Sequence, residues 1–477
     1  MRALLLCFLL LLPVQAQGPA LPDAGQAAPS ASPAPGQVAP GATPQPGAAP
    51  DPDPDQPTRL DVTQAVTLAL QASPTLAEYR ARVREAAYRI DEASSGYFPR
   101  LGFQAGYTNI QPEVSFPGDD GSTILITPTN NYNVRLVLDQ AIYTFGRLEW
   151  ATAAAELTEL SIRQQYRREI ENLMLTTALE FGAAILASQA VEIALANLKA
   201  RELQLRDAQT LFEAGKVARF DVLRGETDLS NARQTVIQAQ TRFNLANARL
   251  LSRLNLPPTH KLELIPLSVE RTFEPDHVAG REQAARDRPE LQALDFAIQA
   301  AEARVNLAGA ELHPNLSLRT LAEHRTASGF TPSQQVTTGL VLDIPIFDGG
   351  LTPARVAQGK EVVEQLTQSR EETRRAVLLE VDQAYLDLIS AQEQLKVAQQ
   401  TTIQATEAER VAQVRYRSGV STSLELQDAI TELSRARFGE ATAEFDFFSA
   451  QCRWYRAVSG KSPIPIPDAL YERTSPE

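Results

Sequence analysis

Side-chain types that carry catalysis or bind metals are scarce in this sequence, and they are not grouped. The four histidines show no metal-ligand spacing, and each is expected to be a solvated surface residue; they are His260, His277, His313 and His324. Neither a GxSxG turn nor a glycine-rich phosphate loop occurs. The sequence therefore predicts no enzymatic activity, no cofactor and no metal site.

The two cysteines do not suggest chemistry either. Cys7 lies in an apolar amino-terminal stretch and follows Leu6, where lipoprotein processing would need a small residue, so we expect it to be removed with an export signal. Cys452 is then alone and cannot form an internal disulfide. We predict that it is a small packed residue.

The most regular chemical feature is a carboxylate that follows a glycine turn, and it occurs twice. Asp221 follows the turn at Gly215, and Glu425 follows the turn at Gly419. Both acids stand where a helix is expected to begin. Negative charge is favourable there because the amino end of a helix carries partial positive charge, so stabilisation of a helix start is one reading of both residues.

These repeated turns belong to a duplication that runs through the chain. Equivalent positions are first 215 and then 204 residues apart, so the first copy holds eleven extra residues (215 minus 204), between Leu101 and Ile142. The pairs include Pro74 and Pro289, Pro99 and Pro314, Ile142 and Ile346, Gly146 and Gly350, and Gly215 and Gly419. An insertion confined to one segment is typical of a surface loop. Two long copies indicate one supersecondary assembly doubled.

Long glycine-poor intervals rich in Ala, Leu, Gln, Glu and Arg predict very long helices. The predicted helical intervals are Val62–Gly96 with a break near Pro74, Arg147–Glu213, Asp221–Leu254, His277–Leu312, Pro353–Arg417 and Leu424–Ser459. A helix of about 65 residues is roughly 100 Å long, which exceeds the depth of one globular core. A coiled-coil seam is predicted at Leu378, Val381, Tyr385, Leu388 and Leu395. A free-standing coiled-coil rod explains the helices equally well.

Four extended segments argue for a membrane protein because apolar and polar residues alternate along them. The apolar stripes are Leu101 to Tyr107, Val134 to Leu138, Leu316 to Ala322 and Val336 to Ile346, with a loop rich in Pro, Gly and Asp between the first two. Ribbons of about ten residues with one apolar face match strands of a transmembrane β-barrel. Half-buried strands of a soluble sheet are the alternative.

Membrane crossing would have to use these strands, because we expect no stretch of the mature chain to be apolar enough for a spanning helix. Transmembrane barrels begin at about eight strands, so four are too few to close. Several copies of the chain are therefore expected to share one barrel.

The amino terminus predicts export. Arg2, the apolar stretch Ala3–Leu12 and the small-residue site Val14–Ala16 form a signal peptide too short to span a bilayer. The predicted organisation is 1–16 signal peptide, 17–57 disordered Pro/Ala-rich linker, 58–256 first repeat with a hairpin at about 101–143, 257–276 connecting segment, 277–460 second repeat with a hairpin at about 316–347, and 461–477 tail. The net charge of -13 argues against nucleic-acid binding.

From residue 60 to residue 460 the pattern resembles the TolC-like outer-membrane efflux family. The resemblance is carried by the helix-to-strand junctions at Pro99–Leu101 and Pro314–Leu316, the return at Ile344–Gly350, and the turns Phe212–Val217 and Arg415–Val420. Each short piece is weak alone, whereas their order, spacing and duplication together are specific.

The resemblance implies a mainly helical protein with a membrane β-barrel. Family members are homotrimers whose twelve-stranded barrel in outer-membrane lipid continues into a periplasmic barrel of twelve helices. The resemblance also implies that the chain passively conducts substrates to the exterior. Its implied partners are a periplasmic adaptor and an inner-membrane efflux pump or ABC transporter. A secreted periplasmic coiled-coil structural or adaptor protein remains the alternative.

The resemblance also implies roles for particular residues. The adaptor-contact tips correspond to Gly215, Lys216, Val217, Gly419 and Val420. The residues of the periplasmic aperture correspond to Asp221, Tyr416, Glu425 and Asp428, where the acids would ring the entrance and the tyrosine would tie the closed aperture by hydrogen bonds. Ser421 departs from the family, in which some members carry a basic residue, so the closed-state ion pairing found there is in doubt.

Overall fold

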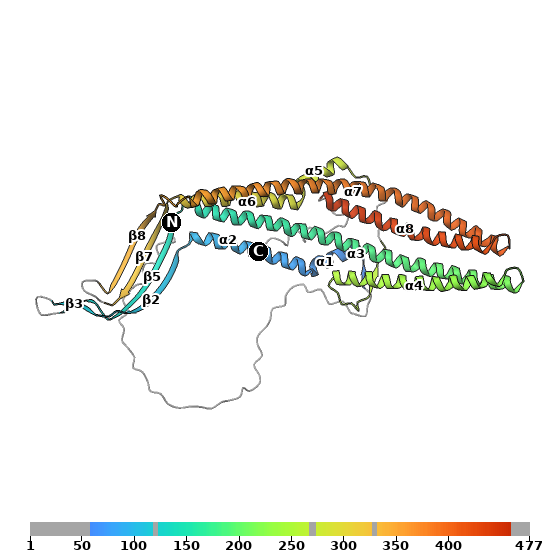
Figure 1. Ribbon diagram of the computed structural model, residues 1–477, viewed down its shortest axis with the longest axis horizontal. Coiled ribbons are helices and arrows are strands. Elements are labelled where there is room, and N and C mark those ends of the chain that lie inside the picture. The colour runs from blue at the N-terminus through green and yellow to red at the C-terminus, as the bar shows by residue number, and fades with distance from the viewer. Residues whose placement is uncertain (1–57, 118–122, 267–272, 327–331, 459–477) are drawn as a thin grey trace, which may run out of the picture. The chain divides into compact units, whose positions relative to one another are not determined.

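Two helices of 67 residues each, α3 (Arg147–Glu213) and α7 (Leu351–Arg417), dominate the computed structural model (Figure 1). The structure describes residues 58–117, 123–266, 273–326 and 332–458, so the predicted signal peptide, linker and tail lie outside the described residues. The remaining helices are α1 (Val62–Ala72), α2 (Pro74–Ser94), α4 (Arg219–Arg253), α5 (His277–Asp287), α6 (Pro289–Gly309) and α8 (Ser423–Val458), with short turns η1 (Ser95–Tyr97) and η2 (Ala310–Leu312).

The predicted helices are confirmed, and local chemistry explains their ends. Proline cannot continue a helix from the preceding turn, so Pro74 and Pro289 each occupy the first turn of a new helix. Gly146 and Gly350, the residues before α3 and α7, have φ angles of 94° and 88°, a left-handed conformation that favours glycine. The duplication thus repeats the conformations that start the long helices.

The predicted strands form one antiparallel sheet in the order β2 (Arg100–Asn109), β5 (Asn130–Tyr143), β7 (Asn315–Arg325) and β8 (Gln334–Asp343). Its register places Phe103, Leu136, Ala322 and Val336 in one row, and Leu318 beside Leu340 on the same face. Phe103 and Leu340 are about 70% exposed, at 70% and 69%. One face of the sheet is therefore largely apolar, interrupted by the pair Thr320 and Thr338, and its large apolar side chains are exposed.

The opposite face of the sheet is polar and carries cross-strand ion pairs. Nε of Arg135 lies 2.8 Å from a carboxylate oxygen of Glu323, and Nε of Arg319 lies 2.6 Å from one of Asp139. All four residues alternate with the apolar row along β5 and β7. The sheet therefore separates an apolar surface from a charged, water-compatible one.

One detail of the strand prediction was wrong, and two further strand pairs were not predicted. Ile344 and Ile346 lie beyond the end of β8 and do not extend its stripe. The loop of the first copy contains a second hairpin, β3 (Val114–Pro117) and β4 (Thr123–Thr127), because the insertion is long enough to pair with itself. The segment between the repeats contributes β6 (Leu262–Leu264), which pairs in parallel with β1 (Thr58–Leu60).

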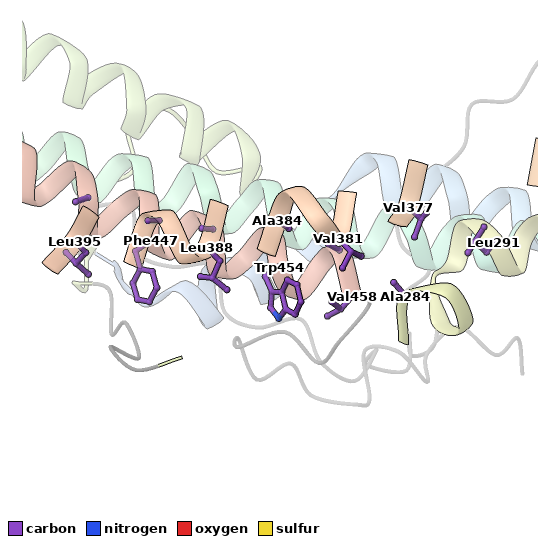
Figure 2. Close-up of a cluster of buried hydrophobic side chains, with 14 residues drawn as sticks. Ala284, Leu291, Val377, Val381, Ala384, Leu388, Leu395, Phe447, Trp454 and Val458 are labelled. Atoms are coloured by element: carbon purple, nitrogen blue, oxygen red, sulfur yellow. The ribbon is translucent and has the colours of Figure 1, made fainter. Parts of the chain in front are cut away.

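The seam between α7 and α8 follows a strict heptad rhythm. The buried residues of α7 there are Val377, Val381, Ala384, Leu388, Ala391 and Leu395, at alternating steps of four and three (Figure 2). They pack against Phe447, Trp454 and Val458 of α8 (Figure 2). The predicted members Leu378 and Tyr385 flank this seam and are only half-buried, because alanine fills the close-contact positions.

The expectation about spanning helices needs one correction. Among the described residues one helix, α3, is long and apolar enough to cross a membrane by length and composition alone. Its apolar residues include Ile170, Leu173 and Met174, which pack with Val66 of α1 and Val83 of α2. Amphipathic periodicity did not reveal this apolar stretch, because apolar residues face several sides of α3. The helix contacts α1, α2, α4, α6 and α8.

Candidate functional site

The site is built around two turns of the same design, at the ends of α3 and α7 that lie opposite the sheet (Figure 1). In the first, the backbone N–H of Lys216 donates to the carbonyl oxygen of Leu211 at 2.8 Å; in the second, that of Val420 donates to the carbonyl oxygen of Arg415 at 3.0 Å. Gly215 and Gly419 adopt φ angles of 71° and 75°. This is the left-handed helix ending that glycine favours.

The turn residues present an open surface. Gly215, Lys216, Gly419 and Val420 are exposed, and Val217 is half-buried. Val420 exposes 70% of its surface, and Phe220, in the first turn of α4, exposes 68%. Each tip therefore offers apolar area that no described residue of the same chain covers.

The predicted aperture acids stand at the starts of α4 and α8. Asp221 and Glu425 lie in the first turns, and the backbone N–H of Glu425 donates to the hydroxyl of Thr422 at 3.3 Å. A carboxylate oxygen of Glu425 lies 3.9 Å from a guanidinium nitrogen of Arg415 across the turn. Asp428 follows on α8 and is exposed. Asp221 and Glu425 therefore lie at helix starts, as one interpretation of the sequence predicted, and the carboxylates remain accessible to solvent.

Tyr416 does not lie on the surface of this chain. Only 2% of it is exposed, and it packs with Leu426 and Ile430 of α8. Burial raises the pKa of its hydroxyl, the nearby charge of Asp221 raises it further, and Ser423 acts in the opposite direction. The structure thus brings Tyr416 close to Asp221, while its predicted role at a closed aperture stays a prediction.

Two arginine contacts near the turns were not predicted. Nε of Arg417, at the end of α7, donates to a carboxylate oxygen of Asp207 on α3 at 3.0 Å. Arg201 of α3 is 93% buried, with 7% exposed, and its guanidinium donates to the hydroxyl of Thr431 on α8 at 2.8 Å. Both contacts join a helix of the first copy to one of the second.

No sequence signal singles out Arg201. The position 204 residues further along is Ala405, but the neighbouring cation Lys199 also has an uncharged equivalent, Ile403, so the difference between the copies is not specific to Arg201. Arg417 is likewise one of several arginines in its stretch.

The remaining residues considered for chemistry are the histidines and Cys452. No group of three or more His, Cys, Asp or Glu that could hold a metal lies within the described ranges. His260 is buried, with Nε2 2.9 Å from the Thr58 hydroxyl, and His277 contacts Asp382 at 2.8 Å, so the expectation of solvated histidines was wrong for His260. Burial raises the pKa of the Cys452 thiol to about 12, which agrees with a packed, unreactive residue.

Comparisons with known proteins agree with this architecture. The sequence model of the outer membrane efflux protein family matches residues 65–256 and 280–458. The alkaline protease secretion protein AprF of Pseudomonas aeruginosa is 25% identical over 350 residues, which cover 71% of this chain and 72% of that protein. Protein CyaE of Bordetella pertussis is 26% identical over 396 residues, covering 81% of this chain and 82% of that protein.

The fold also resembles solved channel structures. The outer-membrane channel OprN has a TM-score of 0.71 and 23% sequence identity, over 84% of this chain and 90% of that one. These matches confirm the resemblance carried by the junctions and turns, and they do not support a periplasmic coiled-coil structural protein. The chain belongs to the outer membrane efflux protein family and is an outer-membrane channel component.

Proposed function

We propose that this chain is one of three identical subunits of an export duct, in which three four-stranded sheets close into a twelve-stranded barrel. The apolar face of each sheet would contact lipid, and the face with the Arg135–Glu323 and Arg319–Asp139 pairs would line a wet lumen. The uncovered apolar face is the observation that carries the proposal. The helices would continue the duct across the periplasm as a second barrel.

The direction of the strands supports this closure. β2 and β8 are the two edges of the sheet, and the alternation of antiparallel pairs makes them antiparallel to each other. The β8 edge of one copy can therefore continue the pattern with the β2 edge of the next. Backbone groups at open edges have no hydrogen-bond partners in lipid, so only a closed ring satisfies them.

The helices also carry apolar area for neighbouring copies. On α7, Leu379 and Leu386 lie seven residues apart and are 56% and 65% exposed. On α4, Ile237 and Leu245 are 68% and 52% exposed. Large apolar side chains exposed along helices of this length support lateral packing of helices between subunits.

The partners proposed for this duct are a periplasmic adaptor at the tips, Gly215–Val217 and Gly419–Val420, and an inner-membrane pump or ABC transporter that supplies the energy. The exposed apolar surface of Val420 and Phe220 supports the docking of helical hairpins at the tips. Because AprF is named for the secretion of alkaline protease, secretion of a polypeptide is the first substrate class to test.

Cross-linking of the sheet edges tests the trimer. We expect that Gln104→Cys on β2, combined in turn with Gln335→Cys, Thr337→Cys or Gly339→Cys on β8, gives an oxidised covalent trimer in at least one combination. Within one chain β5 and β7 lie between these strands, so the cysteines are roughly 14 Å apart. A disulfide bridges Cα atoms no more than about 7 Å apart, so any bond must join two copies.

The measurement is the mobility of the oxidised proteins on a denaturing gel, with Gln104→Cys alone as the control. All positions used lie on the polar face of the sheet, so the substitutions do not disturb the lipid-facing side. Monomers in every combination would contradict closure through these edges.

Conductance in planar bilayers tests the aperture. We expect the double variant Glu425→Gln with Asp428→Asn to need at least about tenfold more of a trivalent cation for half-maximal block. Carboxylates converging on one axis concentrate counter-ions by about ten- to a thousandfold, and this variant removes two of the three predicted aperture acids from every subunit. The control is Glu393→Gln, which removes an exposed acid from the middle of α7. Unchanged block in the double variant would remove both residues from the entrance.

A further inference from the structure

A buried cluster of charges lies at the end of α8 that is farthest from the turns. Arg456, near the end of α8, donates to a carboxylate oxygen of Glu290 on α6 at 2.6 Å and to the side-chain oxygen of Asn172 on α3 at 3.0 Å. A carboxylate oxygen of Glu171 on α3 lies 3.6 Å from another guanidinium nitrogen of Arg456. The side chains of Arg456, Glu171 and Glu290 are only 8%, 12% and 13% exposed. Two buried carboxylates thus share one arginine.

The two carboxylates of this cluster have different pKa values. Burial acts to raise the pKa of Glu290, but the charges of Arg456 and Arg288 outweigh burial, so that pKa lies below its usual value. Burial is the largest effect on Glu171 and raises its pKa, although Arg456 and Arg167 act in the opposite direction. The negative charge of Glu290 raises the pKa of Glu171 further. Glu171 is therefore the carboxylate of this pair that takes up a proton first as the pH falls.

The charged groups around Glu171 come from several helices. Arg167 of α3 lies 3.5 Å from its carboxylate, and Arg288, the residue before α6, acts on it at longer range. The other charged contacts of the surrounding elements are Arg168 with Glu290, Arg288 with Glu380 of α7, Arg286 with Asp287 of α5, Arg80 of α2 with the hydroxyl of Tyr166, and Arg253 of α4 with Glu180. Each of these cations contacts an acceptor other than Glu171. A change in the charge of Glu171 therefore acts most strongly on Arg456 and Arg167.

The two pKa shifts have opposite effects on the pH dependence of stability. Because the pKa of Glu171 is raised in the folded chain, its contribution is full below the unfolded value of about 4.3 and is lost as the pH rises through the folded pKa. Because the pKa of Glu290 is lowered, its contribution is present above about 4.3 and is lost as the pH falls through the folded pKa. Both contributions are present together in mild acid, between the unfolded value and the folded pKa of Glu171.

Protonation of Glu171 changes the energetics of the cluster without breaking it. A buried charge that is incompletely compensated is costly, and a proton removes that charge together with its repulsion by Glu290. Arg456 keeps its hydrogen bonds to Glu290 and Asn172 in either state, so the contact between α3, α6 and α8 remains. The cluster therefore holds these helices together more strongly with one proton than without it.

We infer that Glu171 takes up a proton in mild acid and that this proton strengthens the junction between the two copies of the duplication in each subunit. The effect opposes the loss of stability that acid causes elsewhere, where paired carboxylates become protonated. This pH-sensitive device goes beyond the proposed export duct, because it acts inside one chain and is independent of the acids at the entrance.

The test is denaturant unfolding of the full chain in detergent, followed by circular dichroism at about pH 5 and about pH 8, on either side of the expected titration. Glu171→Gln replaces the carboxyl by a neutral group of the same shape. We expect its unfolding midpoint to lie above that of the wild type at the higher pH and to coincide with it at the lower pH. Glu192→Gln is the matched control, because Glu192 lies on the same helix and is exposed; it should follow the wild type at both pH values.

Infrared difference spectroscopy between the same two pH values detects the proton itself. The wild type should show the carbonyl band of a buried protonated carboxyl at the lower pH, and Glu171→Gln should lack that band. A midpoint of Glu171→Gln that is below the wild type by the same amount at both pH values would overturn the inference, because the charged carboxylate would then be a structural ion-pair partner. A band of equal size in both proteins would also overturn it.

Discussion

Leu340→Arg is expected to abolish recovery of the assembled oligomer from the outer membrane. Leu340 lies on the apolar face of the sheet beside Leu318 and is 69% exposed. An arginine on the lipid face of a barrel costs about 2–4 kcal/mol at the bilayer midplane, and a symmetric oligomer repeats that cost in every subunit. The measurement is the amount of heat-modifiable oligomer in the outer-membrane fraction.

The matched control for this variant is Gln335→Arg. Gln335 lies on the same strand but on the polar face, opposite Glu323, where a positive charge meets a carboxylate. This variant should assemble as the wild type does. Normal assembly of Leu340→Arg would mean that the apolar face is not in lipid, and it would favour a water-soluble particle.

The second large effect is expected at Arg288, where substitution by methionine should lower the free energy of unfolding by about 1–3 kcal/mol, the usual result of leaving buried polar groups without a partner. Arg288 is 3% exposed, and its guanidinium donates to the carboxylates of Glu290 and Glu380 and to the carbonyl oxygens of Arg456 and Ala457. These groups belong to α6, α7 and α8, so the variant leaves two carboxylates and two carbonyl groups without this donor.

Denaturant-induced loss of the helical circular-dichroism signal in detergent measures this effect. Arg286→Met is the control, because Arg286 is exposed and pairs only with the adjacent Asp287. It should unfold at nearly the denaturant concentration of the wild type. Equal midpoints for the Arg288 and Arg286 variants would show that the buried network contributes little to stability.

The positions of the long helices could be predicted because their ends are chemical signals. Glycine at Gly146 and Gly350, and again at Gly215 and Gly419, supplies the left-handed conformation at which each long helix starts or stops. Period-two alternation located the four main strands because one face of the sheet is largely apolar. Duplication made each signal more specific, since every boundary had to be found twice.

The interior contacts could not be predicted in the same way. In the sequence, Arg288 stood out only as the residue before Pro289. Its equivalent in the first copy is Ser73, which caps α2 with its hydroxyl. The role of Arg288 as a buried ion-pair centre depends on Glu380 and Ala457, which lie far away in the sequence. The pairing of β1 with β6 and the position of Tyr416 also depend on long-range packing, which hydrophobic periodicity does not encode.

The open edges of the sheet have a consequence for how subunit number is set. In the proposed barrel every copy has the same orientation across the membrane, so the β2 edge of one copy joins the β8 edge of the next, and this head-to-tail association has no symmetry that stops it after two copies. Such a heterologous interface gives a ring when the rotation per copy closes, and an open ribbon when it does not. A register shift in β5 between Ala141 and Tyr143 is of the kind that bends a strand, so in the proposed barrel the curvature of a single subunit would set the number of copies at which the ring closes.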